Sequence, residues 1–194
     1  MKVLQKIGCL LFLGLMLTSC NNRTVQTQKS EQTSDSSDSK IMLSESLAKA
    51  LTDFNRGAAL LEQYNYLDAA KAFESVLKTA PDWTAARFNL GLAYLNMQEK
   101  SGAQDYLALA KKAFETVLES DPNHLHARFC LGLYYQHLGE NEKALECFRK
   151  VYQTDSKDPY VLYKYAETLI NLGSDEEGRE MLEKTIALDP GFIS

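Results

Sequence analysis

Four cysteines and three histidines are the residues of this chain whose side chains could act as nucleophiles or bind a metal ion. His126 and His137 are eleven residues apart, which on one helix is roughly 16 Å and too far to share an ion. His124 stands near them, but no cluster of further ligands follows. A Cys–His nucleophile pair is conceivable with Cys130 or Cys147, yet neither lies in a sequence typical of a catalytic site. The sequence therefore predicts no catalytic residue, no metal site and no cofactor.

The charge of the chain argues against nucleic acid as a partner. Lys2 and Lys6 are the charged residues of the first nineteen. Without them, 19 basic residues stand against 26 acidic ones in residues 20–194, a net charge of −7. Proteins that bind phosphate backbones concentrate positive charge instead. No glycine-rich phosphate loop and no serine-centred turn of a hydrolase is present either.

The first twenty residues predict export and a lipid anchor. A short basic start is followed by an apolar run at residues 7–17, too short to span a membrane and typical of a secretory signal. The run ends in Leu-Thr-Ser-Cys at residues 17–20, which resembles the lipobox of bacterial lipoproteins. The resemblance implies that residues 1–19 are removed as a signal peptide and that Cys20 is the lipid-attachment residue. The alternative is an ordinary secretory signal with a chance cysteine.

This resemblance also predicts where the protein is located. A lipidated Cys20 places the chain on the cell membrane or the outer membrane, facing the periplasm or the exterior. Asn21 favours the outer membrane, since the family's retention signal for the inner membrane is Asp at that place. Residues 20–43 are rich in Ser, Thr, Gln, Asn and Asp, so we expect a lipidated cysteine followed by a disordered tether. The folded domain is expected at 44–194.

A fixed spacing of small, bulky and turn residues repeats along this domain. Gly57, Ala69, Phe73 and Pro81 are separated by 12, 4 and 8 residues. Small residues where two helices cross let the backbones approach, the bulky residue fills the space between them, and Pro ends the second helix. The pattern recurs as Gly132, Ala144, Phe148 and Ser156, as Ala166, Gly178, Leu182 and Pro190, and, with seven additional residues, as Gly91, Ala110, Phe114 and Pro122.

The copies resemble the tetratricopeptide repeat. The third copy matches best, with Leu131-Gly132, Tyr135, Ala144 and Phe148 where the family's pattern has such residues. The resemblance covers residues 50–192 and implies an all-α fold: a right-handed superhelical array of four helix-turn-helix hairpins, with repeats at about 50–83, 84–124, 125–158 and 159–192. Arg56 departs from the pattern, because an apolar residue is usual there.

The seven-residue insertion of the second repeat lies within residues 98–106. Seven residues are close to two helical turns, so a helix could lengthen without changing its phase. A break at Ser101-Gly102, with Ala103 opening a longer second helix, would give a taller hairpin. A tolerated loop insertion is the equal alternative.

The ends of a repeat array need polar outer faces. Residues 44–49 are expected to extend and shield the first helix. At the other end the sequence leaves no room for a capping helix after Pro190, so Leu182 and Ile186 should be partly exposed. Self-association through this uncapped C-terminal repeat is the resulting hypothesis.

In the repeat family, the first helix of each hairpin lines a concave face that binds extended peptides or helices. Carried onto this chain, the face has an aromatic residue in every copy and apolar, amide, imidazole or acidic residues further along each helix. In the alternative, the aromatic residues pack against neighbouring repeats. We call these ten residues the predicted binding face: Phe54, Phe88, Leu92, Asn96, Phe129, Leu133, His137, Tyr163, Glu167 and Asn171.

The sequence thus predicts a non-enzymatic, membrane-anchored scaffold of the bacterial cell envelope that binds a protein or peptide partner of unknown identity. A role in envelope or outer-membrane assembly is what the family resemblance implies. The alternative is a small-ligand-binding accessory lipoprotein of a transport system. The sequence does not decide whether Cys130 and Cys147 form a disulfide, since it cannot show that their side chains converge.

Overall fold

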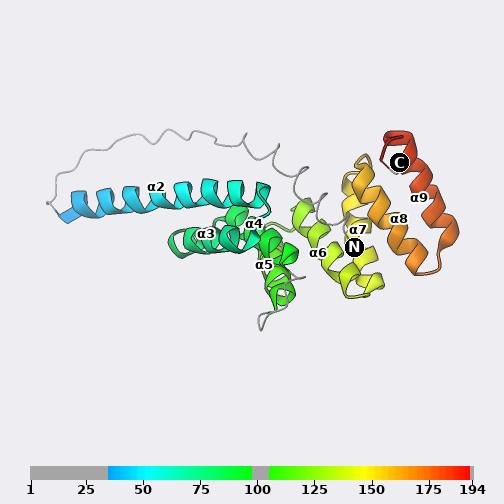
Figure 1. Ribbon diagram of the computed structural model, residues 1–194, viewed down its shortest axis with the longest axis horizontal. Coiled ribbons are helices and arrows are strands. Elements are labelled where there is room, and N and C mark those ends of the chain that lie inside the picture. The colour runs from blue at the N-terminus through cyan, green and yellow to red at the C-terminus, as the bar shows by residue number, and fades with distance from the viewer. Residues whose placement is uncertain (1–34, 98–104, 193–194) are drawn as a thin grey trace. The chain divides into compact units, whose positions relative to one another are not determined.

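The computed structural model describes residues 35–97 and 105–192, with side chains from residue 42, and every regular element in these ranges is an α-helix (Figure 1). The chain divides into two compact units, residues 1–97 and 98–194. The first unit contains α2 (Asp35–Glu62), α3 (Tyr66–Thr79) and α4 (Thr84–Asn96). The second contains α5 (Tyr106–Ser120), α6 (Leu125–His137), α7 (Asn141–Thr154), α8 (Pro159–Asn171) and α9 (Asp175–Leu188).

Helix α2 is longer than the sequence pattern predicts. It begins at Asp35, not near Ser44, and its N-terminal part continues beyond the end of α3 (Figure 1). The prediction of a disordered tether is therefore corrected for residues 35–43; residues 20–34 lie outside the described ranges. Residues 35–43 contain neither Gly nor Pro, and extending an existing helix adds one hydrogen bond for each residue fixed.

The first and third hairpins close in the way that the spacing predicts. Helix α2 packs on α3, and α6 packs on α7. A Cβ atom added to Gly57 would lie 2.8 Å from the Phe73 ring, and one added to Gly132 would lie 2.6 Å from the Phe148 ring. Both rings are fully buried. Glycine is required at these crossings because a larger residue would overlap the ring that fills the hairpin.

The fourth hairpin, α8 with α9, uses the same device with its glycine on the second helix. A Cβ atom on Gly178 would lie 2.5 Å from the Ile170 side chain and 3.2 Å from the backbone oxygen of Ala166. Leu182 takes the place of the aromatic residue and is only half-buried. The exchange of the small residues therefore preserves the close approach of α8 and α9.

The two helices of the second predicted hairpin belong to different units, α4 to the first and α5 to the second. Helix α5 has 15 residues, against 14 in α3 and in α7. The alternative of a longer second helix opening at Ala103 is therefore wrong. The Asp105 carboxylate accepts a hydrogen bond of 3.0 Å from the backbone N–H of Ala108 and fixes the start of α5 at Tyr106. The additional residues precede this cap, and residues 98–104 lie outside the described ranges.

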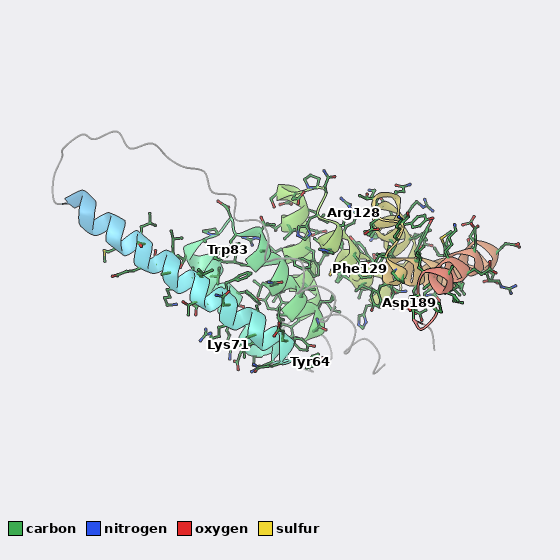
Figure 2. The ribbon with its side chains drawn as sticks, turned by 90° about the horizontal axis from the view of Figure 1, so that it is seen from above. Tyr64, Lys71, Trp83, Arg128, Phe129 and Asp189 are labelled. Carbon is green, nitrogen blue, oxygen red and sulfur yellow. The ribbon has the colours of Figure 1, made fainter. Side chains whose placement is uncertain are left out.

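In three hairpins, a residue with a left-handed backbone conformation follows the first helix. Gly139 after α6 has φ 73°, and Gly173 after α8 has φ 80°. The equivalent residue after α2 is Tyr64, with φ 59°, at the turn labelled in Figure 2. Glycine adopts this conformation without penalty, whereas a side chain with a Cβ atom does not.

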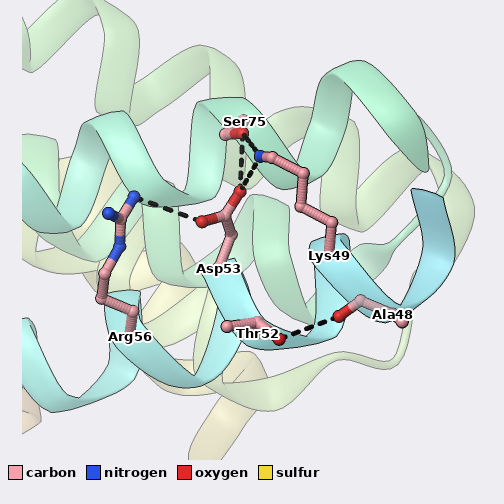
Figure 3. A network of polar contacts seen from close by, with 6 residues as sticks. All are labelled: Ala48, Lys49, Thr52, Asp53, Arg56 and Ser75. Carbon is pink, nitrogen blue, oxygen red and sulfur yellow. Dashed lines mark hydrogen bonds and ion pairs between the residues drawn. The ribbon is translucent and has the colours of Figure 1, made fainter. Parts of the chain in front are cut away.

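A polar network around the buried Asp53 joins α2 to α3 at the edge of the first unit's core (Figure 3). The Asp53 carboxylate is 8% exposed and accepts hydrogen bonds from Lys49 Nζ at 2.7 Å and from Ser75 Oγ at 2.8 Å. Arg56 Nη2 lies 3.3 Å from its other oxygen. These donors hold the pKa of Asp53 below its usual value, the hydrogen bond from Lys49 contributing most and burial opposing it.

Across residues 35–97 and 105–192, no helix combines the length and the apolarity that crossing a membrane requires.

Candidate partner-binding face

In the first unit, the aromatic residue of the predicted binding face is part of a stack. The Phe54 ring on α2 lies parallel to Trp83, with 4.8 Å between the centroids and 8° between the planes. The Phe54 edge also meets the buried Phe73 ring at 5.7 Å. Trp83 is the residue immediately before α4 and remains half-buried (Figure 2). Phe54 therefore presents a stacked aromatic pair to solvent and not a single ring.

Two exposed leucines extend this aromatic pair along α2. Leu51 precedes Phe54 by three residues, Leu47 precedes Leu51 by four, and this spacing places all three on one side of the helix. Leu47 is 49% exposed and Leu51 is 52% exposed. Sequence reasoning missed Leu47, Leu51 and Trp83, although the helical spacing before Phe54 was visible. We call Leu47, Leu51, Phe54 and Trp83 the α2 apolar patch.

The α4 residues of the predicted binding face are less accessible to a partner than the α2 apolar patch. Phe88 is 2% exposed, so its ring is part of the core. Leu92 and Asn96 are half-buried. The Asn96 side-chain amide donates a 2.8 Å hydrogen bond to the Leu92 carbonyl one turn earlier, so part of its donor capacity is already used by its own helix.

In the second unit, Phe129 on α6 is also a core residue (Figure 2). It is 3% exposed, and its ring centroid lies 5.3 Å from Phe148 and 5.6 Å from Tyr160. For Phe88 and Phe129 the packing alternative is correct, because rings with no exposed face cannot contact a partner. Leu133 is half-buried and His137 is exposed at the end of α6, so these two remain available.

A charged group lies on α8 between the remaining predicted residues. Glu167 Oε2 accepts hydrogen bonds from Lys164 Nζ at 2.8 Å and from Gln136 Nε2 on α6 at 3.1 Å. The Lys164 ammonium also lies 5.5 Å from the centroid of the half-buried Tyr163 ring. Asn171 is exposed one turn beyond Glu167. Lys164 is only 8% exposed, so its charge is neutralised locally by Glu167.

Burial beside this carboxylate affects a neighbouring tyrosine. Tyr160 is 8% exposed, and burial, with a smaller contribution from the negative charge of Glu167, raises its pKa to about 12. Tyr160 itself is buried, so the surface beside it is formed by the Asn171 amide, the half-buried Tyr163 ring and the Lys164–Glu167 ion pair.

Phe192 covers the start of α8. Its ring centroid lies 5.9 Å from Tyr160 and 5.7 Å from Tyr163. The contact between Phe192 and Tyr163 parallels that between Trp83 and Phe54, because Phe192 follows Pro190 by two residues as Trp83 follows Pro81. A proline followed two residues later by an aromatic residue was the available signal. The last hairpin thus has an aromatic cover over α8, while Ile186 on α9 is 47% exposed.

The surroundings of Cys130, Cys147 and His124 indicate structural roles for these side chains. Cys130 and Cys147 are free and buried; burial raises the pKa of both thiols, that of Cys147 to about 11. Such thiols are poor nucleophiles. His124 Nδ1 accepts a 3.1 Å hydrogen bond from the Ala127 backbone N–H and caps α6. In the part of the chain that the structure describes, no three His, Cys, Asp or Glu side chains are grouped to hold a metal ion.

Two sequence models of protein families match the chain. The model described as tetratricopeptide repeat matches residues 54–110. The model described as anaphase-promoting complex, cyclosome, subunit 3 matches residues 104–185. Among curated protein sequences, none matches the chain significantly. The matches fall on the residues whose spacing carried the resemblance to the repeat.

Solved structures of MamA have a similar fold. One, comprising MamA from residue 41 to its end from Desulfovibrio magneticus RS-1, is 22% identical with a TM-score of 0.64, over 75% of this chain and 78% of that one. Another, a crystal structure of MamA, is 21% identical with a TM-score of 0.61, over 71% and 76% of the two chains. At such identities the likeness concerns the fold. The all-α fold of paired helices is confirmed.

Proposed function

We propose that this all-helical repeat array is a protein-interaction module, anchored to a membrane of the bacterial cell envelope, that binds a protein or peptide partner through the first helices of its hairpins. The repeat fold supports binding and not catalysis, because it is built from packed helices whose exposed faces differ from hairpin to hairpin. Membrane attachment through lipidated Cys20 is the second part of the proposal, supported by the sequence at residues 17–20.

The α2 apolar patch is the observation that carries the proposal. Leu47 and Leu51 are each about half exposed, and the Phe54–Trp83 stack adjoins them. Large apolar and aromatic side chains held rigidly at a surface are the usual anchors of protein interfaces. A partner segment with apolar residues at helical or extended spacing would remove these side chains from water.

The second unit supplies a different contact. Lys164 and Gln136 both donate to Glu167 Oε2, and no hydrogen bond to Glu167 Oε1 is recorded among the described residues. That oxygen can accept a backbone N–H or a side-chain amide of the partner. With His137 at the end of α6 and Asn171 at the end of α8, both exposed, the second unit provides polar groups that can satisfy a peptide backbone.

A cross-linked pull-down from cells tests the α2 apolar patch. The full chain carrying Leu47→Glu plus Leu51→Glu should lose at least about tenfold of the partner recovered by wild type, because an anchor site would then hold carboxylates. Phe54 is unsuitable as a variant, since it also packs on Phe73 in the core.

Leu67→Glu is the matched control, because Leu67 on α3 is 42% exposed and lies outside the patch. It should recover the partner as wild type does. Equal recovery by the double variant and wild type would refute the patch as a binding site. A metabolite co-purifying with wild type in native mass spectrometry, with no protein partner, would favour the small-ligand alternative.

A further inference from the structure

Each first helix after α2 packs on the second helix that precedes it: α4 on α3, α6 on α5 and α8 on α7. Three positions, spaced by four and then three residues, are buried in all three of these helices: Ala86, Leu90, Ala93; Ala127, Leu131, Tyr134; Val161, Tyr165, Thr168. The equivalent residues of α2 are Thr52, Arg56 and Ala59, and all three are exposed. The exposed face of α2 is therefore equivalent to the face of α4, α6 and α8 that packs on the preceding helix.

Helix α9 presents the complementary face. Phe73, Phe114 and Phe148 are fully buried on the earlier second helices, whereas their equivalent Leu182 is half-buried. Ile186 is 47% exposed, although its equivalents on α3, α5 and α7 are all half-buried. Among the described residues, no helix covers this side of α9 as α4, α6 and α8 cover the earlier ones.

The junctions inside each unit show which residues meet across such an interface. Across α3 and α4, the Glu74 carboxylate accepts a hydrogen bond from the Tyr94 hydroxyl. Across α7 and α8, Arg149 Nε donates to the Tyr165 hydroxyl at 3.4 Å, and the Tyr152 ring lies 5.6 Å from the Tyr165 ring. The residue five places after the small residue of a second helix thus reaches the outward face of the following first helix.

At the two uncovered faces, the residues equivalent to Arg149 and Tyr165 of the α7–α8 junction carry opposite charges. Glu183 follows Gly178 by five residues, as Arg149 follows Ala144, and it is exposed with no ion pair recorded in the described part of the chain. Arg56 directly precedes Gly57, as Tyr165 precedes Ala166. The Arg56 side chain is 60% exposed and uses one nitrogen toward Asp53 at 3.3 Å. Its fork of five N–H donors leaves others for a second carboxylate.

We propose that copies of this chain associate end to end, with α9 of one copy packing on α2 of the next and Glu183 pairing with Arg56 across the contact. Ile186, the equivalent of Tyr152, is then removed from water against α2, as Tyr152 is against Tyr165 on α8. This contact is separate from the binding of another protein on the α2 apolar patch. Because its two sides differ, the contact is heterologous and produces open chains or closed rings.

Co-purification of two differently tagged full-length copies from detergent-solubilised cells tests the pairing. Wild-type copies should co-purify. When both copies carry Glu183→Arg, or both carry Arg56→Glu, like charges meet at the contact and recovery should fall at least about tenfold. When one copy carries Glu183→Arg and the other Arg56→Glu, every contact again joins opposite charges, so recovery should return. Copies that each carry both changes should also co-purify.

Glu119→Arg in both copies is the matched control, because Glu119 is an exposed glutamate of α5 outside the contact. It should leave recovery unchanged, and thermal unfolding should show that each variant is folded. The proposal is overturned if wild-type copies do not co-purify or if Glu183→Arg pairs persist. It is equally overturned if mixing the two reversals fails to restore recovery, or if Glu119→Arg lowers recovery as much as Glu183→Arg does.

Discussion

Asp53 is the buried charge on which the joint between α2 and α3 depends. Asp53→Asn should reduce the free energy of unfolding at pH 7 by about 1–3 kcal/mol, because it weakens hydrogen bonds from Lys49 and Ser75 to a charged, buried acceptor. The folded pKa is lowered, so the stabilisation is full above the unfolded pKa of about 3.9 and disappears as pH falls through the folded value. The difference between wild type and variant should therefore shrink below about pH 4.

Urea unfolding followed by fluorescence measures this effect, since Trp83 is the single tryptophan and lies in the same unit as Asp53. Asp82→Asn is the control, because Asp82 is an exposed carboxylate of the same unit and its replacement should change stability by less than about 0.5 kcal/mol. If the difference in unfolding free energy between wild type and Asp53→Asn did not change with pH, the charge of Asp53 would not be the source of its stabilising effect.

At the level of single residues, the sequence predicts which helix face a side chain occupies better than whether it is exposed. Phe54, Phe88 and Phe129 stand at equivalent places, yet only Phe54 keeps an exposed part. Exposure is decided by residues distant in sequence, such as Tyr160 against Phe129. Spacing along one helix does not contain that information. The remaining members of the predicted binding face stay a prediction.

The turn between α2 and α3 contains a residue whose backbone conformation is unfavourable for its side chain. Tyr64 has φ 59° where the third and fourth hairpins have Gly139 and Gly173. Tyr64→Gly should stabilise the first unit by about 1 kcal/mol, because a left-handed residue with a Cβ atom costs roughly 1–2 kcal/mol and the Tyr64 ring contact with Tyr66 offsets part of the gain. Thermal unfolding followed by Trp83 fluorescence measures the change.

Tyr64→Ala separates the backbone effect from the loss of the ring. Alanine keeps the Cβ atom, so this variant should lose the contact with Tyr66 and gain nothing. If glycine and alanine at position 64 gave the same stability, the left-handed backbone would not be the source of the strain.

At the level of helices, the sequence predicts pairing more reliably than helix ends. The Gly57–Phe73 and Gly132–Phe148 contacts confirm the pairing, because close backbone approach demands small residues at fixed places. The start of α2 was predicted too late, since polar composition alone does not stop a helix that already has a packed segment. The start of α5 is fixed by the N-cap at Asp105. The sequence alone does not show which of several possible capping residues is used.

For the molecule as a whole, repetition supplies the fold and its interruptions indicate function. Arg56 breaks the apolar pattern of the first repeat, and its equivalents Leu90, Leu131 and Tyr165 are all buried. A charged residue is tolerated at position 56 because, among the described residues, no helix of this unit covers it. Arg56 contacts either water or, in the proposed association, Glu183 of another copy. The repeat pattern predicts the helix junctions that the structure shows within each unit, whereas the partners of the two outer faces have to be inferred from charge.

In the proposed function, attachment of the molecule to a membrane depends on Cys20, which lies outside the described ranges. Cys20→Ala should abolish labelling of the protein by a palmitate analogue in cells, because the lipobox resemblance makes Cys20 the acylated residue. Cys9→Ala is the matched control and should leave labelling intact, since the lipobox resemblance involves Cys20 alone. Cys130 and Cys147 are buried in the folded chain and are not available as substitute sites. Persistent labelling of Cys20→Ala would place the acylation at another residue and refute Cys20 as the anchor of the proposed function.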